Sequence, residues 1–360
     1  MIRSLRAIVS FAGKPPVVGG LPAPERVRRA LERSGGVAEV AVVDLASAGT
    51  EAAIPSGPAL LVAPNGLPDV AALLRFCEEA EARGTRSAWV WKGTSIALYA
   101  PDGTGLGSAA GLLGGPVPAG DFAVLPAPDT AWTPLTSENE IRLAEARLFA
   151  SLPQPTDGYL SRLDRRVSIA LTRLLVQTPL TPNAITGLSL LAGLAGVALV
   201  ASPAYVACLA GTLLVWLSAI LDGCDGEVAR LKLASSESGR RFDLFVDHVV
   251  NFAVLLAVPV HVHRARPDLP IGWATAALAF GVLMSMATVG LLLGKSSPAG
   301  RQSVDRFLER IASRDFVYLL IPLAAIARLE WFLYAAAIGA NVFWAAAGFR
   351  LVRRPAGTRA

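Results

Sequence analysis

Cysteine, histidine and charge are scarce in this sequence, and each scarcity argues against a class of protein. Among 360 residues there are only 3 cysteines and 3 histidines, and charged residues make up 17%. Cys77, Cys208 and Cys224 form no CxxC pair, which excludes a disulfide framework, and so few histidines argue against a zinc site. Hydrophobic residues make up 53%, and the mean hydropathy of +0.50 is high for a soluble enzyme.

Two further features are missing from the sequence, a signal peptide and a nucleic-acid-binding motif. The apolar run in MIRSLRAIVSF is short and no small-residue cleavage site follows it, so we expect the N-terminal part to stay in the cytoplasm. The formal net charge is +5, but the arginines cluster beside hydrophobic runs. This distribution indicates the positive-inside pattern and attraction to anionic lipid head groups rather than to nucleic acid.

The first part of the chain has the pattern of an α/β domain. Over residues 1–135, short apolar runs alternate with helical patterns, which predicts a largely parallel sheet covered by helices. Residues 136–180 are a predicted linker, in which SENE begins a helix with a serine cap and a glutamate three residues later. Residues 159–177 place apolar residues opposite arginines, which predicts an amphipathic helix at the membrane surface; a linker helix packed on the first domain is the alternative.

Apolar runs of membrane-spanning length dominate residues 181–352, and residues 353–360 form a basic tail. The predicted all-α membrane domain has six spans, near 183–201, 204–233, 241–263, 271–293, 315–328 and 331–351. The fifth run is short, so five spans or one re-entrant segment is the alternative. With six spans, the arginine balance predicts a multi-pass protein of the inner (plasma) membrane with both termini and the active site on the cytoplasmic side.

Four aspartates lie in this apolar region. Asp222 and Asp225 are three residues apart, and Asp243 and Asp247 are four apart, so each pair shares one face of a helix. Carboxylates in membrane segments are costly and mark functional sites. Four close carboxylates repel one another unless cations intervene, and oxygen ligands select Mg²⁺, with Mn²⁺ or Ca²⁺ as competitors. We expect two metal ions that clamp a phosphate or pyrophosphate; ordinary loop charges are the alternative.

The pattern DxxDGxxAR from Asp222 to Arg230, followed by Gly239, Asp243 and Asp247, resembles the signature of the CDP-alcohol phosphotransferase family. The resemblance implies a membrane enzyme that moves a phosphoryl-alcohol group from a CDP-alcohol to the hydroxyl of a second alcohol and releases CMP. It also implies that the first three aspartates hold the metals, that Asp247 contributes to the second metal, and that Asp247 is the base that takes the acceptor's proton.

Further roles follow from the same resemblance. The implied CDP-binding residues are Asn183, Thr186, Asp222, Gly226, Ala229, Arg230, Ser236 and Gly239. Pro182 and Asn183 fit a plain helix start equally well. Lys295, Arg301 and Arg314 are candidates for binding a phosphorylated acceptor, although ordinary positive-inside residues are the alternative. A homodimer is implied by the family alone.

The junction from SENE to TPNAIT and the segment SRDFVYLL resemble bifunctional inositol-phosphate cytidylyltransferase/di-myo-inositol phosphate phosphate synthases. In that branch the N-terminal nucleotidyltransferase domain makes CDP-inositol. Here AIVSFAGKPPVVGG lacks the glycine-rich turn, and Asn65 stands where the branch carries a metal-binding aspartate. We therefore expect an inactive nucleotidyltransferase-like domain that is kept for structure or regulation.

The substrates stay open at this point. The donor is CDP-diacylglycerol or CDP-inositol made elsewhere, and the acceptor is inositol phosphate or another polar alcohol. The product is accordingly a phospholipid or a soluble inositol phosphodiester. The alternative from a different class is a non-enzymatic Mg²⁺ transporter or scaffold, but the spans outside the aspartate cluster have few polar residues to form a path.

Overall fold

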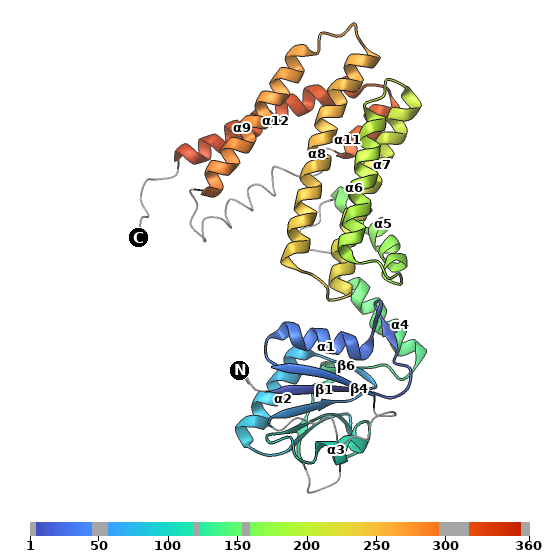
Figure 1. The fold of residues 1–360 in the computed structure, drawn as a ribbon, viewed down its shortest axis with the longest axis vertical. Coiled ribbons are helices and arrows are strands. Elements are labelled where there is room, and N and C mark those ends of the chain that lie inside the picture. Colours follow the sequence, from blue (N-terminus) through green and yellow to red (C-terminus); the bar gives the residue numbers. More distant parts are fainter. Residues whose placement is uncertain (1–4, 45–56, 118–121, 153–158, 295–316, 354–360) are drawn as a thin grey trace. The chain divides into compact units, whose positions relative to one another are not determined.

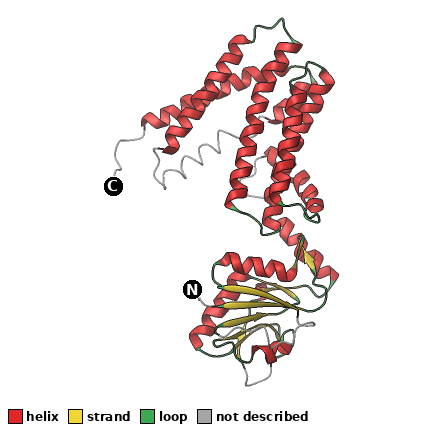
Figure 2. Ribbon diagram, in the orientation of Figure 1, coloured by secondary structure: helices red, strands yellow, loops and turns green. Residues whose placement is uncertain are grey.

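The computed structural model describes residues 5–44, 57–117, 122–152, 159–294 and 317–353. The chain divides into two compact units (Figure 1). Unit 1 comprises Met1–Thr156, Ile169–Leu180 and Glu227–Ser235, and unit 2 comprises Asp157–Ser168, Thr181–Gly226 and Ser236–Ala360. In the described residues all strands belong to unit 1, whereas unit 2 is helical (Figure 2).

A six-stranded sheet with the order β4-β1-β5-β8-β7-β9 forms the centre of unit 1. Its strands are β1 Arg6–Phe11, β4 Glu39–Asp44, β5 Ala59–Val62, β7 Ser87–Trp91, β8 Thr94–Ala100 and β9 Ala123–Pro126. Strand β1 is parallel to β4 and β5, and β7 is parallel to β9, but β8 runs antiparallel to both of its neighbours. The sheet is thus mixed, and the prediction of a largely parallel sheet is wrong at β8. The reason is a tight hairpin at Lys92 and Gly93, whose φ angles of 49° and 83° suit a two-residue turn.

Helices cover both faces of this sheet. Leu60 and Val62 of β5 pack with α1 (Ala23–Ser34) and α2 (Val70–Arg83), whereas their neighbours Ala59 and Leu61 pack toward α3 (Leu106–Ala109) on the other face, as the alternation of side chains along a strand requires. The smaller elements of unit 1 are β2 Val17–Val18, β3 Leu21–Pro22, β6 Gly66–Pro68, β10 Trp132–Pro134, η1 Ala110–Leu112 and η2 Asp129–Ala131.

Helix α4 (Glu138–Ala150) begins as the sequence predicts. The Ser137 hydroxyl accepts a hydrogen bond from the backbone N–H of Glu140 at 3.3 Å, and the Glu140 carboxylate accepts one from the N–H of Ser137 at 3.0 Å. This capping box confirms the predicted helix start.

Seven helices run through the rest of the described chain. They are α5 Tyr159–Leu175, α6 Pro182–Val200, α7 Tyr205–Leu231, α8 Glu237–Ala265, α9 Gly272–Gly294, α11 Val317–Ala325 and α12 Leu329–Arg353. Among the described residues, five helices are long and apolar enough to span a membrane: α6, α7, α8, α9 and α12. Six spans are not confirmed: the span predicted at 315–328 overlaps α11, which has 9 residues and begins where the undescribed residues 295–316 end.

Glycines let the first membrane helices approach closely. A Cβ atom added to Gly196 of α6 would lie 2.8 Å from the backbone nitrogen of Val215 and 2.9 Å from the carbonyl oxygen of Gly211, both on α7. A Cβ on Gly193 would lie 2.7 Å from Val250 of α8. Contacts between small residues are the usual means by which helices associate in lipid. They hold α6, α7 and α8 together, and α7 and α8 carry the four aspartates.

Candidate active site

Three of the four aspartates converge between α7 and α8. Asp222 and Asp225 lie three residues apart on α7, and Asp243 lies in the second turn of α8. One carboxylate oxygen from each lies within 4.8 Å of the others. Asp222 and Asp225 are buried, with 9% and 5% of their surfaces exposed, and Asp243 is half-buried. Carboxylates from two helices thus lie close together in the fold.

Helix α6 supports this cluster although it carries none of the aspartates. The hydroxyl of Thr186 is hydrogen-bonded to Oδ2 of Asp225, and only 2% of Thr186 is exposed. The same hydroxyl lies 3.1 Å from the carbonyl oxygen of Pro182, one turn earlier in α6. Thr181 caps this helix by accepting from the N–H of Ala184 at 3.2 Å. Thr186 thus fixes the orientation of one carboxylate from a neighbouring helix.

The three carboxylates fit a metal ion. Oδ1 of Asp243 is buried, and no described residue forms a hydrogen bond with it. A buried carboxylate oxygen without such a partner is costly unless a cation compensates it. The available ligand atoms are all oxygens, and oxygen ligands suit hard divalent cations. Asp222, Asp225 and Asp243 could therefore hold a metal ion.

Asp247 lies one turn beyond Asp243 on α8 and is half-buried. It interacts electrostatically with Asp225 and with Asp243. It is not one of the three residues whose oxygens converge. Asp247 is therefore near the cluster of Asp222, Asp225 and Asp243 but not part of it.

Three of the residues predicted to contact the nucleotide meet at the start of α8. The Ser236 hydroxyl caps this helix by accepting from the N–H of Gly239 at 3.0 Å. A Cβ atom on Gly239 would lie 3.0 Å from the side-chain oxygen of Asn183 and 3.0 Å from the Ser236 hydroxyl. The missing Cβ of Gly239 therefore allows polar atoms of α6 and α8 to approach each other closely.

The remaining predicted residues lie on α7 or outside the described residues. Gly226 follows Asp225 on α7 and is half-buried, and Ala229 and Arg230 lie in the last turn of the same helix, with Arg230 exposed. The predicted acceptor-binding residues Lys295, Arg301 and Arg314 lie outside the described residues.

Sequence reasoning missed Asp164 of α5. Its carboxylate accepts a hydrogen bond from Nε1 of Trp216 at 3.2 Å and another from the hydroxyl of Tyr318. A second contact joins the same two helices, because the Cys224 thiol donates to the carbonyl oxygen of Ser168 at 3.5 Å. Asp164 is the single carboxylate among the arginines in LSRLDRRVSI, which was the available signal.

Sequence reasoning also missed Glu227. It lies two residues after Asp225 and is completely buried. Its place inside the DxxDGxxAR pattern is the signal that could have drawn attention to it.

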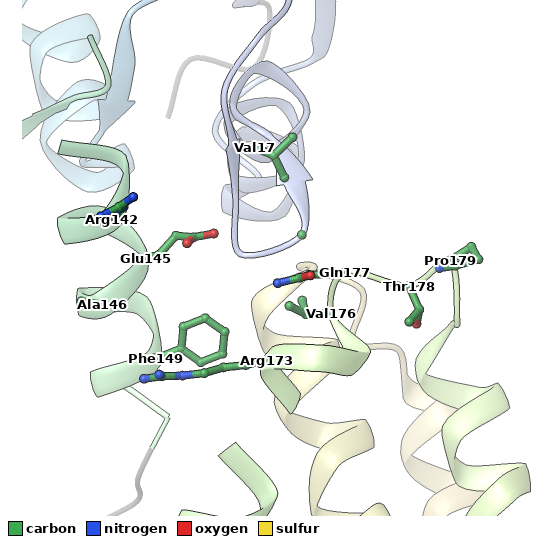
Figure 3. Close-up of a pocket in the computed structure, with 11 residues that line it drawn as sticks. Val17, Arg142, Glu145, Ala146, Phe149, Arg173, Val176, Gln177, Thr178 and Pro179 are labelled. Carbon is green, nitrogen blue, oxygen red and sulfur yellow. The ribbon is translucent and has the colours of Figure 1, made fainter. Parts of the chain in front are cut away.

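A separate cavity of about 730 Å³ lies in unit 1, between the β2–β3 turn, α4 and the end of α5 (Figure 3). Arg173 stacks over the ring of Phe149 in its wall, at 5.1 Å from the ring centroid. None of the four aspartates lines this cavity. It is thus distinct from the carboxylate cluster.

Five apolar helices and a buried acidic cluster define a multi-pass membrane protein with a candidate metal site. Residues 179–351 match the sequence model of the CDP-alcohol phosphatidyltransferase family. The C-terminal part of the chain is therefore a CDP-alcohol phosphatidyltransferase domain, and it contains the whole aspartate cluster.

Curated relatives agree with this family. The chain is 36% identical over 133 residues to the "Bifunctional IPC transferase and DIPP synthase" of Aquifex aeolicus, covering 37% of this chain and 29% of the relative. It is 38% identical over 165 residues to the protein of the same name in Thermococcus kodakarensis, covering 44% and 35%. It is 32% identical over 148 residues to "CDP-diacylglycerol--serine O-phosphatidyltransferase" of Mycobacterium leprae, covering 37% and 48%. The chain thus spans less than half the length of each relative.

Proposed function

We propose that the protein is an integral-membrane CDP-alcohol phosphotransferase. It transfers a phosphoryl-alcohol group from a CDP-alcohol to the hydroxyl of a second, polar alcohol and releases CMP. The observation that carries this proposal is the convergence of Asp222, Asp225 and Asp243 inside a domain of this family. Enzymes that cleave a pyrophosphate use such oxygen clusters to hold divalent cations against the phosphates.

In the proposed site, Asp222, Asp225 and Asp243 would hold two Mg²⁺ ions, Asp247 would contribute to the second, and Mn²⁺ could substitute. Bound ions would supply positive charge that offsets the negative charge of the donor's phosphates and of the departing CMP. Thr186 keeps Asp225 in its ligating orientation through the buried hydrogen bond.

Asp247 is the proposed base. Its carboxylate accepts the proton of the acceptor hydroxyl, whose oxygen then attacks the phosphorus that carries the donor alcohol. A new P–O bond forms, the P–O–P bridge breaks, and the bridging oxygen leaves with CMP. The half-buried position of Asp247, one turn from Asp243, supports a role beside the carboxylate cluster rather than at its centre.

The donor nucleotide is proposed to lie against the start of α8. Asn183, Ser236 and Gly239 meet there, because the missing side chain of Gly239 lets the polar side chains of the other two residues approach closely. Gly226 and Ala229 are proposed to lie against the CDP moiety along α7, and Arg230 is proposed to pair with a phosphate. Binding of a phosphorylated acceptor by Lys295, Arg301 and Arg314 stays a prediction from the sequence.

The N-terminal sheet is proposed to be a nucleotidyltransferase-like domain without activity. In this sheet β1 lies between β4 and β5, so the direction in which successive strands are added reverses at β1. Ligands of such sheets bind outside the carboxyl ends of the strands at the reversal. Those ends lead to the short turn with Lys14 and to exposed Asn65. An amide cannot supply the negative charge that a Mg²⁺–nucleotide needs.

The test for this part is pyrophosphate release from CTP. We expect none from the full-length protein offered CTP, Mg²⁺ and inositol 1-phosphate, both in the wild type and in Asn65→Asp, because the glycine-rich turn is also missing. CTP-dependent pyrophosphate release by the wild type would contradict an inactive domain.

The proposed topology has six spans, α6 to α9, a fifth that includes α11, and α12, in the inner membrane with the N-terminal domain and active site cytoplasmic. The domain limits 1–135, 136–180, 181–352 and 353–360, and the homodimer, stay predictions. The names of the relatives support two donors, since one group names a DIPP synthase and the other CDP-diacylglycerol.

One assay separates the two donors. The purified protein in detergent with Mg²⁺ is given CDP-diacylglycerol or CDP-inositol, each with inositol 1-phosphate, and CMP release is measured. We expect release with one donor and loss of release in Asp247→Asn. Asp268→Asn, which alters an exposed carboxylate in the loop before α9, is the matched control. Undiminished CMP release by Asp247→Asn would remove the proposed base.

A further inference from the structure

Three arginines on one face of α1 bind the segment that joins the two aspartate-bearing helices. Within unit 1, Arg26 donates to the carbonyl oxygen of Leu231 at 2.6 Å, Arg29 to that of Lys232 at 2.8 Å, and Arg33 to that of Ser235 at 2.8 Å. Positions i, i+3 and i+7 lie on the same side of a helix. We call these residues the α1 clamp, and residues 231–235 the clamped segment.

Arg26 is the buried member of the clamp, with 7% of its surface exposed. Its guanidinium also donates to the carbonyl oxygens of Val18, at 3.1 and 2.7 Å, and of Gly19, at 3.1 Å. None of the ion pairs between described residues includes Arg26. Burial lowers the pKa of Arg26 to about 10, so the side chain stays charged at neutral pH. A buried cation is costly unless its hydrogen bonds are satisfied, and here backbone carbonyls satisfy them.

Contacts with residues outside the clamped segment stabilise its conformation. Leu231 is the last residue of α7, so its carbonyl is one of those without a partner inside the helix, and the helix dipole favours a cation there. Leu233 follows with a φ of 47°, in the left-handed region that favours glycine. A residue other than glycine is strained in this region, and surrounding contacts must offset the strain.

The clamped segment also forms hydrogen bonds with the residues that precede α6. The ammonium group of Lys232 donates to the carbonyl oxygens of Thr178 at 2.8 Å and Leu180 at 3.2 Å. Burial lowers the pKa of Lys232. Residues 178–180 lead directly into α6, which carries Asn183 and Thr186.

The β2–β3 turn adds a further contact in unit 1. A Cβ atom on Gly20, which has a φ of 75°, would lie 2.3 Å from the carbonyl oxygen of Val176. Val17 and Val176 both line the cavity beside this contact (Figure 3). The turn that accepts from Arg26 therefore lies directly against the end of α5.

We propose that the α1 clamp is a set of positioning residues for the transferase site. It fixes the clamped segment, through which the chain passes from Arg230 to Ser236 at the donor-binding start of α8. This proposal rests on the proposed function. The clamp gives the N-terminal domain, which is proposed to be inactive, a role in the transferase reaction. The clamp requires α1 and the β2–β3 turn but no bound nucleotide.

The test uses Arg26→Ala and the double variant Arg29→Ala/Arg33→Ala in the full-length protein. We expect the KM for the CDP-alcohol donor to rise and kcat/KM to fall about 10- to 100-fold, because a small displacement of a binding group has effects of this size. The KM for the acceptor should stay unchanged. Arg26→Lys keeps the charge but loses the planar fork, and should give an intermediate value.

Arg28→Ala is the matched control. Arg28 lies on the same helix but pairs with Glu25 at 2.7 Å and Glu32 at 2.6 Å, and no hydrogen bond to the clamped segment is present among its described contacts. Its donor KM should match the wild type. Hydrogen exchange provides the second readout: residues 231–235 should exchange faster in the clamp variants and not in Arg28→Ala, while strands β1 and β5 keep their protection in all variants.

The outcomes are separable. Clamp variants with wild-type donor KM and wild-type exchange at 231–235 would overturn the proposal. An equal kinetic loss in Arg28→Ala would also overturn it, because the arginines would then only stabilise α1. If the wild type releases no CMP with any donor, the proposed function fails, and exchange at 231–235 together with the binding affinity for CDP alone decides the clamp.

Discussion

The hydroxyl of Thr186 on α6 is hydrogen-bonded to the carboxylate of Asp225 on α7. Both residues are buried, with exposures of 2% and 5%. A helix without aspartates therefore orients one of the candidate metal ligands. Hydrogen bonds of this kind to a ligand commonly tune the metal affinity of a site.

Replacing Thr186 by valine should weaken metal binding without loss of the fold. Valine has the same shape but cannot donate to Asp225, so we expect the Mg²⁺ concentration that gives half-maximal CMP release to rise about 10- to 100-fold. Thr186→Ser keeps the hydroxyl and should stay near the wild type. Titration of activity with Mg²⁺ in both variants measures this, and identical Mg²⁺ dependence in valine and serine variants would contradict it.

Replacing Asp243 by asparagine should change stability and activity in opposite directions. Without metal, the variant has one fewer repelling carboxylate, so its melting temperature in EDTA should exceed that of the wild type, by an amount equivalent to about 1 kcal/mol. The rise in melting temperature on adding Mg²⁺ should disappear, and CMP release should fall by more than about 100-fold. Thermal unfolding in detergent with and without Mg²⁺ measures the first two effects.

Glu237→Gln is the control for this experiment. Glu237 begins α8, close in sequence to Asp243, but it is exposed and bonded to Arg240 at 2.8 Å and Arg241 at 3.1 Å. It should leave the Mg²⁺ effect intact. A wild-type Mg²⁺ response in Asp243→Asn would remove that residue from the metal site.

The parts of the site that depend on local periodicity could be predicted from the sequence. The spacing of Asp222 with Asp225, and of Asp243 with Asp247, places each pair on one helix face, and this needs only the period of a helix. In the fold, the first three aspartates converge. The capping box at Ser137 is likewise local, since all its atoms lie within four residues.

The contacts between distant residues could not be predicted in the same way. Thr186 was expected to contact the nucleotide, but its contact with Asp225 depends on how closely α6 approaches α7. Asp164 accepts from Trp216 and Tyr318, which are 52 and 154 residues away. The clamp joins α1 to residues more than 200 positions later, at 205 residues for Arg26 and Leu231. No periodicity relates such positions.

Acid should weaken α1 through Glu25. Hydrogen bonds from Arg28, and further from Arg29, lower the pKa of Glu25 to about 2 from an ordinary value near 4.5. Because the pKa is depressed in the folded state, the stabilisation is present above about pH 4.5 and is lost as the pH falls toward 2. The group is partly solvated, so the effect is no more than about 1 kcal/mol.

Hydrogen exchange of residues 23–34, compared with the intrinsic rate at each pH, measures this effect. We expect protection in the wild type to decrease between pH 4.5 and the acid limit of the experiment, and Glu25→Gln to respond less. Parallel responses of the two proteins would contradict the assignment to Glu25.

Two glycines of α6 should respond oppositely to alanine. A Cβ on Gly196 would lie within 3 Å of backbone atoms of α7, at 2.8 Å from Val215 and 2.9 Å from Gly211, so the two helices must separate. We expect Gly196→Ala to lower the stability of the protein in detergent by about 1–3 kcal/mol, as overpacking does. CMP release should fall with it, because Thr186 then moves away from Asp225.

Gly187 lies on the same helix, but a Cβ there would meet no atom within 4 Å. Alanine favours a helix over glycine by up to about 1 kcal/mol, so Gly187→Ala should leave the melting temperature unchanged or raise it. Thermal unfolding of the two variants under one detergent condition gives the comparison. Because both changes add one methyl group to α6, a difference between them reports the contact with α7 rather than a change in helix propensity. Equal melting temperatures would mean that α6 and α7 are not held by this close approach.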